Sequence, residues 1–146
     1  MWTSILLRLG FTDFVALRLI GSLLLTLAVE LPVAWLLGFR SRRELLAVTL
    51  VNVVTNPPLV LVLVGIDALA VGQDATLFVP LVAVLEVATV VIEWFLLRWA
   101  TRRSWRDALK VSFWANAASF VVGLFFWTAL AFVIASAINA AWVPFN

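Results

Sequence analysis

The sequence predicts an all-helical integral membrane protein, a four-transmembrane-helix bundle built from two repeated helical hairpins. Of its 146 residues, 65% are hydrophobic and only 12% are charged, and the mean hydropathy is +1.15. A soluble domain carries about 25% charged residues, and one of this size has too much surface to hide such an apolar excess. The composition therefore excludes a soluble enzyme, a disordered tail and a nucleic-acid-binding domain, and it makes the lipid bilayer the expected partner.

The apolar residues gather into four long runs, at residues 14–37, 45–66, 75–99 and 108–135. Each run exceeds the ~20 residues that a helix needs to cross a hydrocarbon core of ~30 Å. The runs do not alternate with period two, which favours helices over barrel strands. We therefore expect one membrane domain over residues 1–146, with a first hairpin at 14–73 and a second at 75–140.

Residues 1–12 precede the first run and are expected to form a separate interfacial segment. Trp2, Ile5 and Leu9 recur at helical spacing, and Ser4 falls on the opposite face. This pattern is typical of a short amphipathic helix that lies in the membrane interface. A frayed N-terminus is the alternative interpretation.

The basic residues are placed asymmetrically along the chain. Most of them lie in the loops at residues 38–44 and 98–107, whereas the loop between the second and third runs carries Asp67 and Asp74 and no base. Basic loops stay on the cytoplasmic side of a membrane. We therefore expect both basic loops to be cytoplasmic and both termini to lie outside, in a bacterial inner (plasma) membrane.

The two predicted hairpins share a sequence pattern. Glu30 lies ten residues before the Arg-Ser-x-Arg-acid motif that begins at Arg40, and Glu93 lies ten residues before the same motif at Arg103. This pattern indicates a parallel internal repeat. Ordinary helix capping is the alternative explanation, because the motif contains a capping box of Ser41 with Glu44 and a looser version in the second hairpin.

Amide and hydroxyl side chains extend the similarity into the spans. Asn52-x-x-Thr55 in the second run recurs as Asn116-x-x-Ser119 in the fourth. Together with the glutamates, these residues place oxygen atoms at matching positions of the two hairpins. Carboxylate and amide oxygens at one depth suit a hard cation or a proton relay. Protonated glutamates and asparagines that merely join helices are the structural alternative.

Three carboxylates fall inside the predicted spans, where a charge costs ~2.5–3.5 kcal/mol or more and normally faces the bundle interior. Glu30 lies eight residues before Gly38, roughly 12 Å from the cytoplasmic end of its helix. Glu93 has the same depth, and Glu86 lies two turns further out on the same helical face. The candidate ion- or proton-binding residues are Glu30, Asn52, Thr55, Asn56, Glu86, Glu93, Asn116 and Ser119.

We consider three of the prolines inside the spans as candidate helix breaks. Pro57 and Pro58 follow Asn56, and Pro32 follows Glu30 by two residues. Proline removes an amide donor and frees a carbonyl one turn earlier, and broken helices commonly form ion sites in transporters. A plain kink that shapes the bundle is the alternative.

These observations favour a small cation- or proton-coupled transporter or channel that acts as an oligomer. We expect no cofactor beyond a possible bound cation, whose identity the sequence leaves open. A non-catalytic scaffold or accessory subunit of a larger membrane complex is the main alternative. An intramembrane metal-dependent enzyme is a third hypothesis, weakened because the chain has no Cys or Tyr and no His for general-base chemistry. No catalytic residue is predicted.

Overall fold

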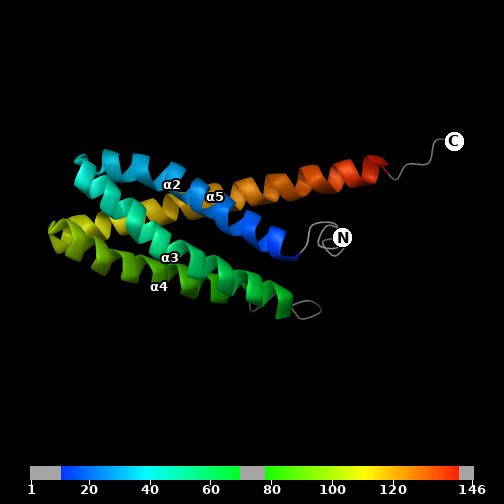
Figure 1. Cartoon of the computed structure of the whole chain (residues 1–146), viewed down its shortest axis with the longest axis horizontal. Coiled ribbons are helices and arrows are strands. Elements are labelled where there is room, and N and C mark those ends of the chain that lie inside the picture. The colour runs from blue at the N-terminus through cyan, green and yellow to red at the C-terminus, as the bar shows by residue number, and fades with distance from the viewer. Residues whose placement is uncertain (1–10, 70–77, 142–146) are drawn as a thin grey trace.

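The computed structural model describes residues 11–69 and 78–141, and it confirms an all-helical chain with four long apolar helices. The labels follow Figure 1. The helices are α2 (Phe11–Leu36), α3 (Arg42–Leu69), α4 (Phe78–Thr101) and α5 (Trp105–Ala141). The predicted interfacial segment lies outside the described residues, except that α2 begins at Phe11 and so includes its last two positions.

Each helix contains a stretch that is long and apolar enough to cross a membrane. These candidate spans are Asp13–Leu36, Arg42–Ile66, Pro80–Thr101 and Trp105–Leu130. Large apolar side chains such as Leu24, Val84 and Phe125 face outward, whereas two glutamates and three asparagines of the described helices are buried inside: Glu30, Glu93, Asn52, Asn56 and Asn116. This distribution reverses that of a soluble protein and is the one expected of an integral membrane protein.

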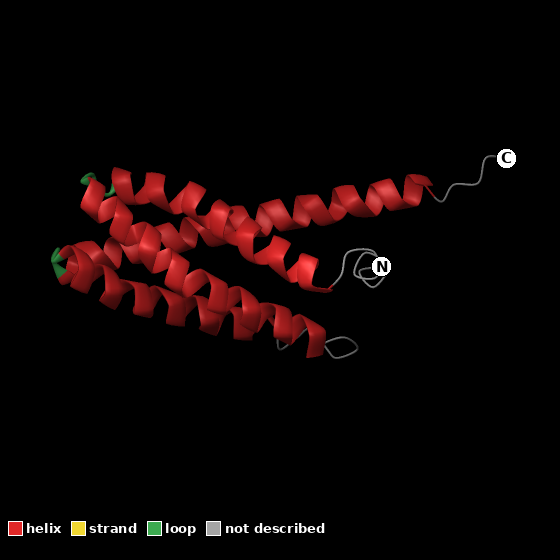
Figure 2. Ribbon diagram, in the orientation of Figure 1, coloured by secondary structure: helices red, strands yellow, loops and turns green. Residues whose placement is uncertain are grey.

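The four helices form a bundle in which each helix packs against two others. α2 contacts α3 and α5, and α4 contacts the same two helices. Figure 1 shows the tight α2–α3 and α4–α5 connections together at the left end, with the helices diverging toward the right. Figure 2 shows α5 continuing beyond the other helices at that diverging end. We call the end with the two tight connections the loop end.

Both tight connections use left-handed backbone and serine caps. Gly38 ends α2 with φ at 101°, a conformation that glycine adopts without a Cβ clash. The Glu44 amide donates to Ser41 Oγ at 3.2 Å, and the Ser41 amide donates to Glu44 Oε2 at 3.0 Å. This is the predicted capping box. In the second hairpin the Asp107 amide donates to Ser104 Oγ at 3.1 Å and the Ser104 hydroxyl donates to Asp107 Oδ2 at 2.8 Å, which is the looser version that the sequence predicts.

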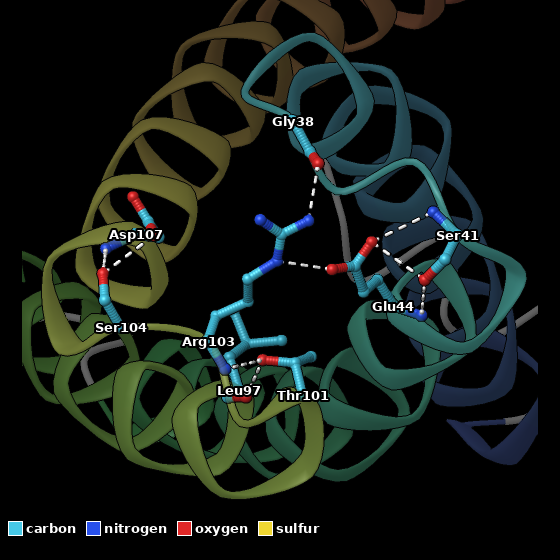
Figure 3. Close-up of polar contacts among 8 residues, drawn as sticks. All are labelled: Gly38, Ser41, Glu44, Leu97, Thr101, Arg103, Ser104 and Asp107. Atoms are coloured by element: carbon cyan, nitrogen blue, oxygen red, sulfur yellow. Dashed lines mark hydrogen bonds and ion pairs between the residues drawn. The ribbon is translucent and has the colours of Figure 1, made fainter.

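Arg103 ties the two hairpins together at the loop end. Its Nε lies 2.6 Å from Glu44 Oε1, and its Nη2 donates to the Gly38 carbonyl at 3.2 Å, as Figure 3 shows. The Glu44 carboxylate raises the pKa of the Arg103 guanidinium above its usual range. The second basic loop is thereby fixed to the end of α2 and the start of α3.

The three prolines do not break their helices, which corrects the expectation drawn from the sequence. α2 runs uninterrupted through Pro32, and α3 runs uninterrupted through Pro57 and Pro58. Proline removes only the hydrogen bond of its own amide, and neighbouring helices allow it inside a membrane helix. The remaining ladder of hydrogen bonds keeps α2 and α3 helical on both sides of these residues.

An apolar core closes the loop end of the bundle. Ala34, Phe39, Val48, Leu97 and Val111 are buried together there. They lie between the tight connections and the level of Glu30 and Glu93, because the helical members stand about one turn nearer the loops. Apart from Ser112, the buried polar residues therefore lie above this core, as seen from the loop end.

Candidate functional site

Glu30 is held by one residue from each neighbouring helix. Asn52 Nδ2 of α3 donates to Glu30 Oε2 at 2.8 Å, and Ser119 Oγ of α5 lies 2.9 Å from Glu30 Oε1. The carboxyl group is thus contacted on both oxygens. Glu30 is only 1% exposed, so these contacts replace the water that a surface carboxyl would bind.

Glu93 has the same arrangement with the roles of the hairpins exchanged. Asn116 Nδ2 of α5 donates to Glu93 Oε2, and Thr55 Oγ1 of α3 lies 2.6 Å from Glu93 Oε1. Each glutamate therefore receives the asparagine of its own hairpin and the hydroxyl of the other hairpin. Residues at equivalent positions of the two hairpins thus make equivalent contacts.

Together these contacts form a circuit around the bundle. The four side-chain bonds cross the α2–α3, α3–α4, α4–α5 and α5–α2 interfaces, one bond for each pair of packed helices. We call this set the polar ring; its members are Glu30, Asn52, Thr55, Glu93, Asn116 and Ser119. The ring lies at one level on four separate helices. This level agrees with the equal depths that the sequence predicts for its glutamates and asparagines.

The hydroxyl groups of the ring each have two acceptors in reach. Thr55 Oγ1 lies 3.0 Å from the Val51 carbonyl oxygen as well as near Glu93, and Ser119 Oγ lies 3.1 Å from the Asn116 carbonyl oxygen as well as near Glu30. A hydroxyl carries one hydrogen and accepts through its lone pairs. It can donate to an ionised carboxylate, or donate to the backbone and accept from a protonated carboxyl. The heavy-atom geometry of the ring therefore suits both protonation states.

A cavity of about 560 Å³ lies above the polar ring, on the side away from the loop end. It runs along α5 from Asn116 to Thr128 and along α2 from Glu30 to Arg18, twelve residues in each case, which is about 18 Å of helix. All eight candidate binding residues line it, namely Glu30, Asn52, Thr55, Asn56, Glu86, Glu93, Asn116 and Ser119. The structure thus brings together the whole set that the sequence singled out, whereas none of the three prolines lines the cavity.

Asn56 and Glu86 stand in the cavity wall and not in the ring. Asn56 Nδ2 donates to Thr26 Oγ1 at 3.1 Å, while its buried Oδ1 has no partner. Glu86 is half-buried and receives no hydrogen bond from the part of the chain that the structure describes. Thr26 is not among the residues predicted from the sequence. A signal for it existed, since Thr26 and Thr89 each precede a ring glutamate by four residues.

The polar surface of this site is rich in acceptors. The ring can bind or release protons, and its carboxyl and amide oxygens can also accept hydrogen bonds from a cation in the cavity. Among residues 11–69 and 78–141, no group of three or more His, Cys, Asp or Glu residues is arranged to hold a metal ion. Apolar side chains such as Leu59, Phe120 and Leu124 line the cavity beside these oxygens, so its chemistry is that of a mixed polar and apolar pocket.

Comparison of the chain with protein-family models, curated proteins and solved structures finds no match.

Proposed function

We propose that this chain is a small membrane transporter or channel, coupled to protons or another cation, whose coupling site is the polar ring. The observation that carries the proposal is the pair of buried carboxyl groups at the floor of a cavity. Ionisable residues inside membrane helices are costly and commonly mark ion pathways or proton relays. Glu30 and Glu93 are the residues to which we assign the carried charge.

The hydroxyl geometry of the ring supports protons as the coupling ion. Proton uptake by Glu93 needs only the Thr55 hydroxyl to turn from the carboxylate to the Val51 carbonyl. The Ser119 hydroxyl offers Glu30 the same exchange with the Asn116 carbonyl. Loading and unloading a proton at either glutamate would thus leave the helices in place.

The same contacts support the proposal that the hairpins α2–α3 and α4–α5 are true repeats. The reciprocal bonds of Glu30 and Glu93 are those expected if an approximate two-fold axis, parallel to the bundle, relates the two hairpins. We further propose that the loop end is cytoplasmic and that both termini lie outside, because the loop end carries the basic residues. In this orientation the cavity lies on the outer side of the ring and the apolar core seals the inner side.

We also propose that the chain works as a homo-oligomer. α5 continues to Ala141, beyond the candidate span that ends at Leu130. Phe125 and Phe132 on this helix are each 72% exposed, which offers an apolar surface to a second copy. Native mass spectrometry of the protein released from lipid would give the number of chains directly.

An accessory-subunit role is the second candidate, and the ring also provides its supporting observation. Each helix interface of the bundle is joined by a ring bond, which is what an architectural polar layer requires. Interhelical bonds of this kind contribute about 0.6 kcal/mol each on average. Under this interpretation the glutamates hold the bundle together and carry no ion.

The two candidates are separated by a proton-exchange experiment on the Glu30→Gln/Glu93→Gln double variant. The protein is reconstituted in liposomes that contain a pH-sensitive dye, and proton flux is followed under an imposed pH gradient with Na⁺, Mg²⁺ or Ca²⁺ added in turn. Infrared difference spectra between mildly acidic and mildly alkaline buffer report the carboxyl groups themselves. Asp13→Asn is the matched control, because it removes an exposed carboxylate outside the cavity.

We expect the double variant to lose the flux and the protonated-carboxyl band while it keeps the helical fold, and Asp13→Asn to keep all three. Flux and spectra that are unchanged in the double variant would eliminate the transporter proposal. A wild type without flux, whose fold or assembly is lost when the ring glutamates are replaced by alanine, would assign the ring to architecture.

A further inference from the structure

The cavity above the polar ring has the size and lining of a pocket for an organic molecule. Its volume of about 560 Å³ falls within the roughly 300–1,000 Å³ of small-molecule sites, which are mostly apolar with a few oriented polar groups. Leu59, Leu63, Phe120 and Leu124 supply apolar wall from α3 and α5. An inorganic ion alone would leave most of this wall without a contact.

The polar groups of the cavity are acceptors in excess of donors. Asn52 and Asn116 use their Nδ2 atoms on the ring glutamates, and neither amide oxygen accepts a hydrogen bond from the described residues. Asn56, which is 7% exposed, keeps a buried Oδ1 without a partner. The buried Asn56 oxygen above all favours a ligand that brings N–H or O–H donors, because a buried polar group without a hydrogen bond is unfavourable.

The charge of the cavity selects among such donors. Three carboxyl groups line it, from Glu30, Glu86 and Glu93, against one guanidinium, from Arg18. Arg18 stands over the ring of Trp127, 5.5 Å from its centroid, twelve residues from Glu30 along α2. When two or more of these carboxyl groups are ionised, one guanidinium at the far end does not give the cavity a net positive charge, and the carboxylates at the ring end favour a bound cation over a neutral or anionic ligand.

We propose that the cavity binds a protonated organic amine, with its ammonium group at Glu86 and the polar ring and its aliphatic or aromatic body against the apolar wall. This inference rests on the proposed function, because it supplies the substrate of the coupled ring. When a ring glutamate is protonated, binding of the ammonium releases one proton to solvent, and the charge of the occupied site stays the same.

The test uses three probes of the same shape: phenethylamine, 2-phenylethanol and 3-phenylpropanoate. Binding to the full chain in lipid nanodiscs is measured by calorimetry, with empty nanodiscs subtracted, and proton release is recorded in weakly buffered solution. A charge-assisted hydrogen bond is roughly twice as strong as the neutral bond that the alcohol would make. We therefore expect the amine to bind at least about tenfold more tightly than the alcohol, the carboxylate to bind least, and only the amine to release protons.

Two glycines supply a matched pair of variants. A Cβ at Gly123 or at Gly65 meets nothing within 4 Å, but only Gly123 lines the cavity. Gly123→Leu fills cavity space and is expected to weaken amine binding at least about tenfold, whereas Gly65→Leu on the outer face of α3 keeps wild-type affinity. Equal binding of the amine and the alcohol, or equal affinities of the two leucine variants, would overturn the proposal.

The outcomes also separate this inference from the proposed function. Proton exchange that depends on Glu30 and Glu93, without selective amine binding, would support the coupled ring and reject the amine as substrate. Selective amine binding that Gly123→Leu removes, without proton release and without flux, would support the amine pocket and reject the coupling. Proton release by Na⁺ or Ca²⁺ alone, with no preference among the three probes, would replace the amine with an inorganic ion.

Discussion

Substituting glutamine for a ring glutamate should preserve the fold, and substituting alanine should not. In Glu30→Gln, the amide oxygen can accept from Asn52 Nδ2, and the amide nitrogen can donate to Ser119 Oγ, which then donates to the Asn116 carbonyl. Glutamine thus reproduces the hydrogen bonds of a protonated glutamate at each of the contacts that the structure shows. We expect its free energy of unfolding to stay within about 1 kcal/mol of the wild type.

Alanine at position 30 removes both contacts with the neighbouring helices. Each interhelical bond contributes on average 0.6 and at most about 1.7 kcal/mol, so the two lost bonds together cost about 1–3 kcal/mol. The Asn52 amide nitrogen then keeps only its bond to the Val48 carbonyl. The truncated side chain also leaves a void, because Glu30 is only 1% exposed. Both effects add to the loss, so the alanine variant should be clearly less stable than the glutamine variant.

The measurement is reversible unfolding of the reconstituted protein in bicelles, with helix content followed by circular dichroism. The same pair at Glu93 repeats the test in the other hairpin. Glu86→Ala is the matched control, because it removes a carboxyl group that receives no hydrogen bond from the described residues. Our account of the ring would be refuted if glutamine destabilised the bundle as much as alanine, or if Glu86→Ala cost as much as Glu30→Ala.

Three further predictions concern the loop end and the orientation of the chain. Gly38→Ala should lose about 1–2 kcal/mol of unfolding free energy because φ is 101° there, whereas Gly65→Ala inside α3 should gain up to about 1 kcal/mol; unfolding of both variants checks the opposite signs. Arg103→Gln should cost little stability, because the ion pair of Arg103 with Glu44 is partly exposed, and a large loss in the same assay would contradict this expectation. A cysteine at Arg40, in a chain that has no natural cysteine, should react with a membrane-impermeant thiol reagent only after cells are opened; labelling of intact cells would reverse the proposed orientation.

The sequence could predict the helices because the bilayer constrains them so strongly. A run of apolar residues without alternation can satisfy its backbone in lipid only as a helix, and four such runs in one chain leave little choice of architecture. The capping box at Ser41 was equally predictable, since its hydrogen bonds connect residues three apart. The predicted depths of Glu30 and Glu93 required only the rise per residue of a helix.

The sequence failed where the outcome depended on what surrounds a residue. Pro57 and Pro58 suggested a broken helix, but α3 is continuous because the loss of single hydrogen bonds is tolerated within a packed bundle. Thr26 attracted no notice, since a lone threonine is common in membrane helices, and only the fold places it against Asn56. The contact of Thr26 with Asn56 and the continuity of α3 both depend on how the helices pack.

The sequence by itself determined the all-helical class, the four helices that are long and apolar enough to cross a membrane, and the list of polar residues within them. Only the tertiary structure decided how those residues pair. It places Ser119 against Glu30 and Thr55 against Glu93, across 89 and 38 residues of chain. The packed helices also form the cavity that all eight candidate residues line. The physical reason is that residue spacing determines which side chains share a face of one helix. The packing of the four helices determines which side chains meet across their interfaces.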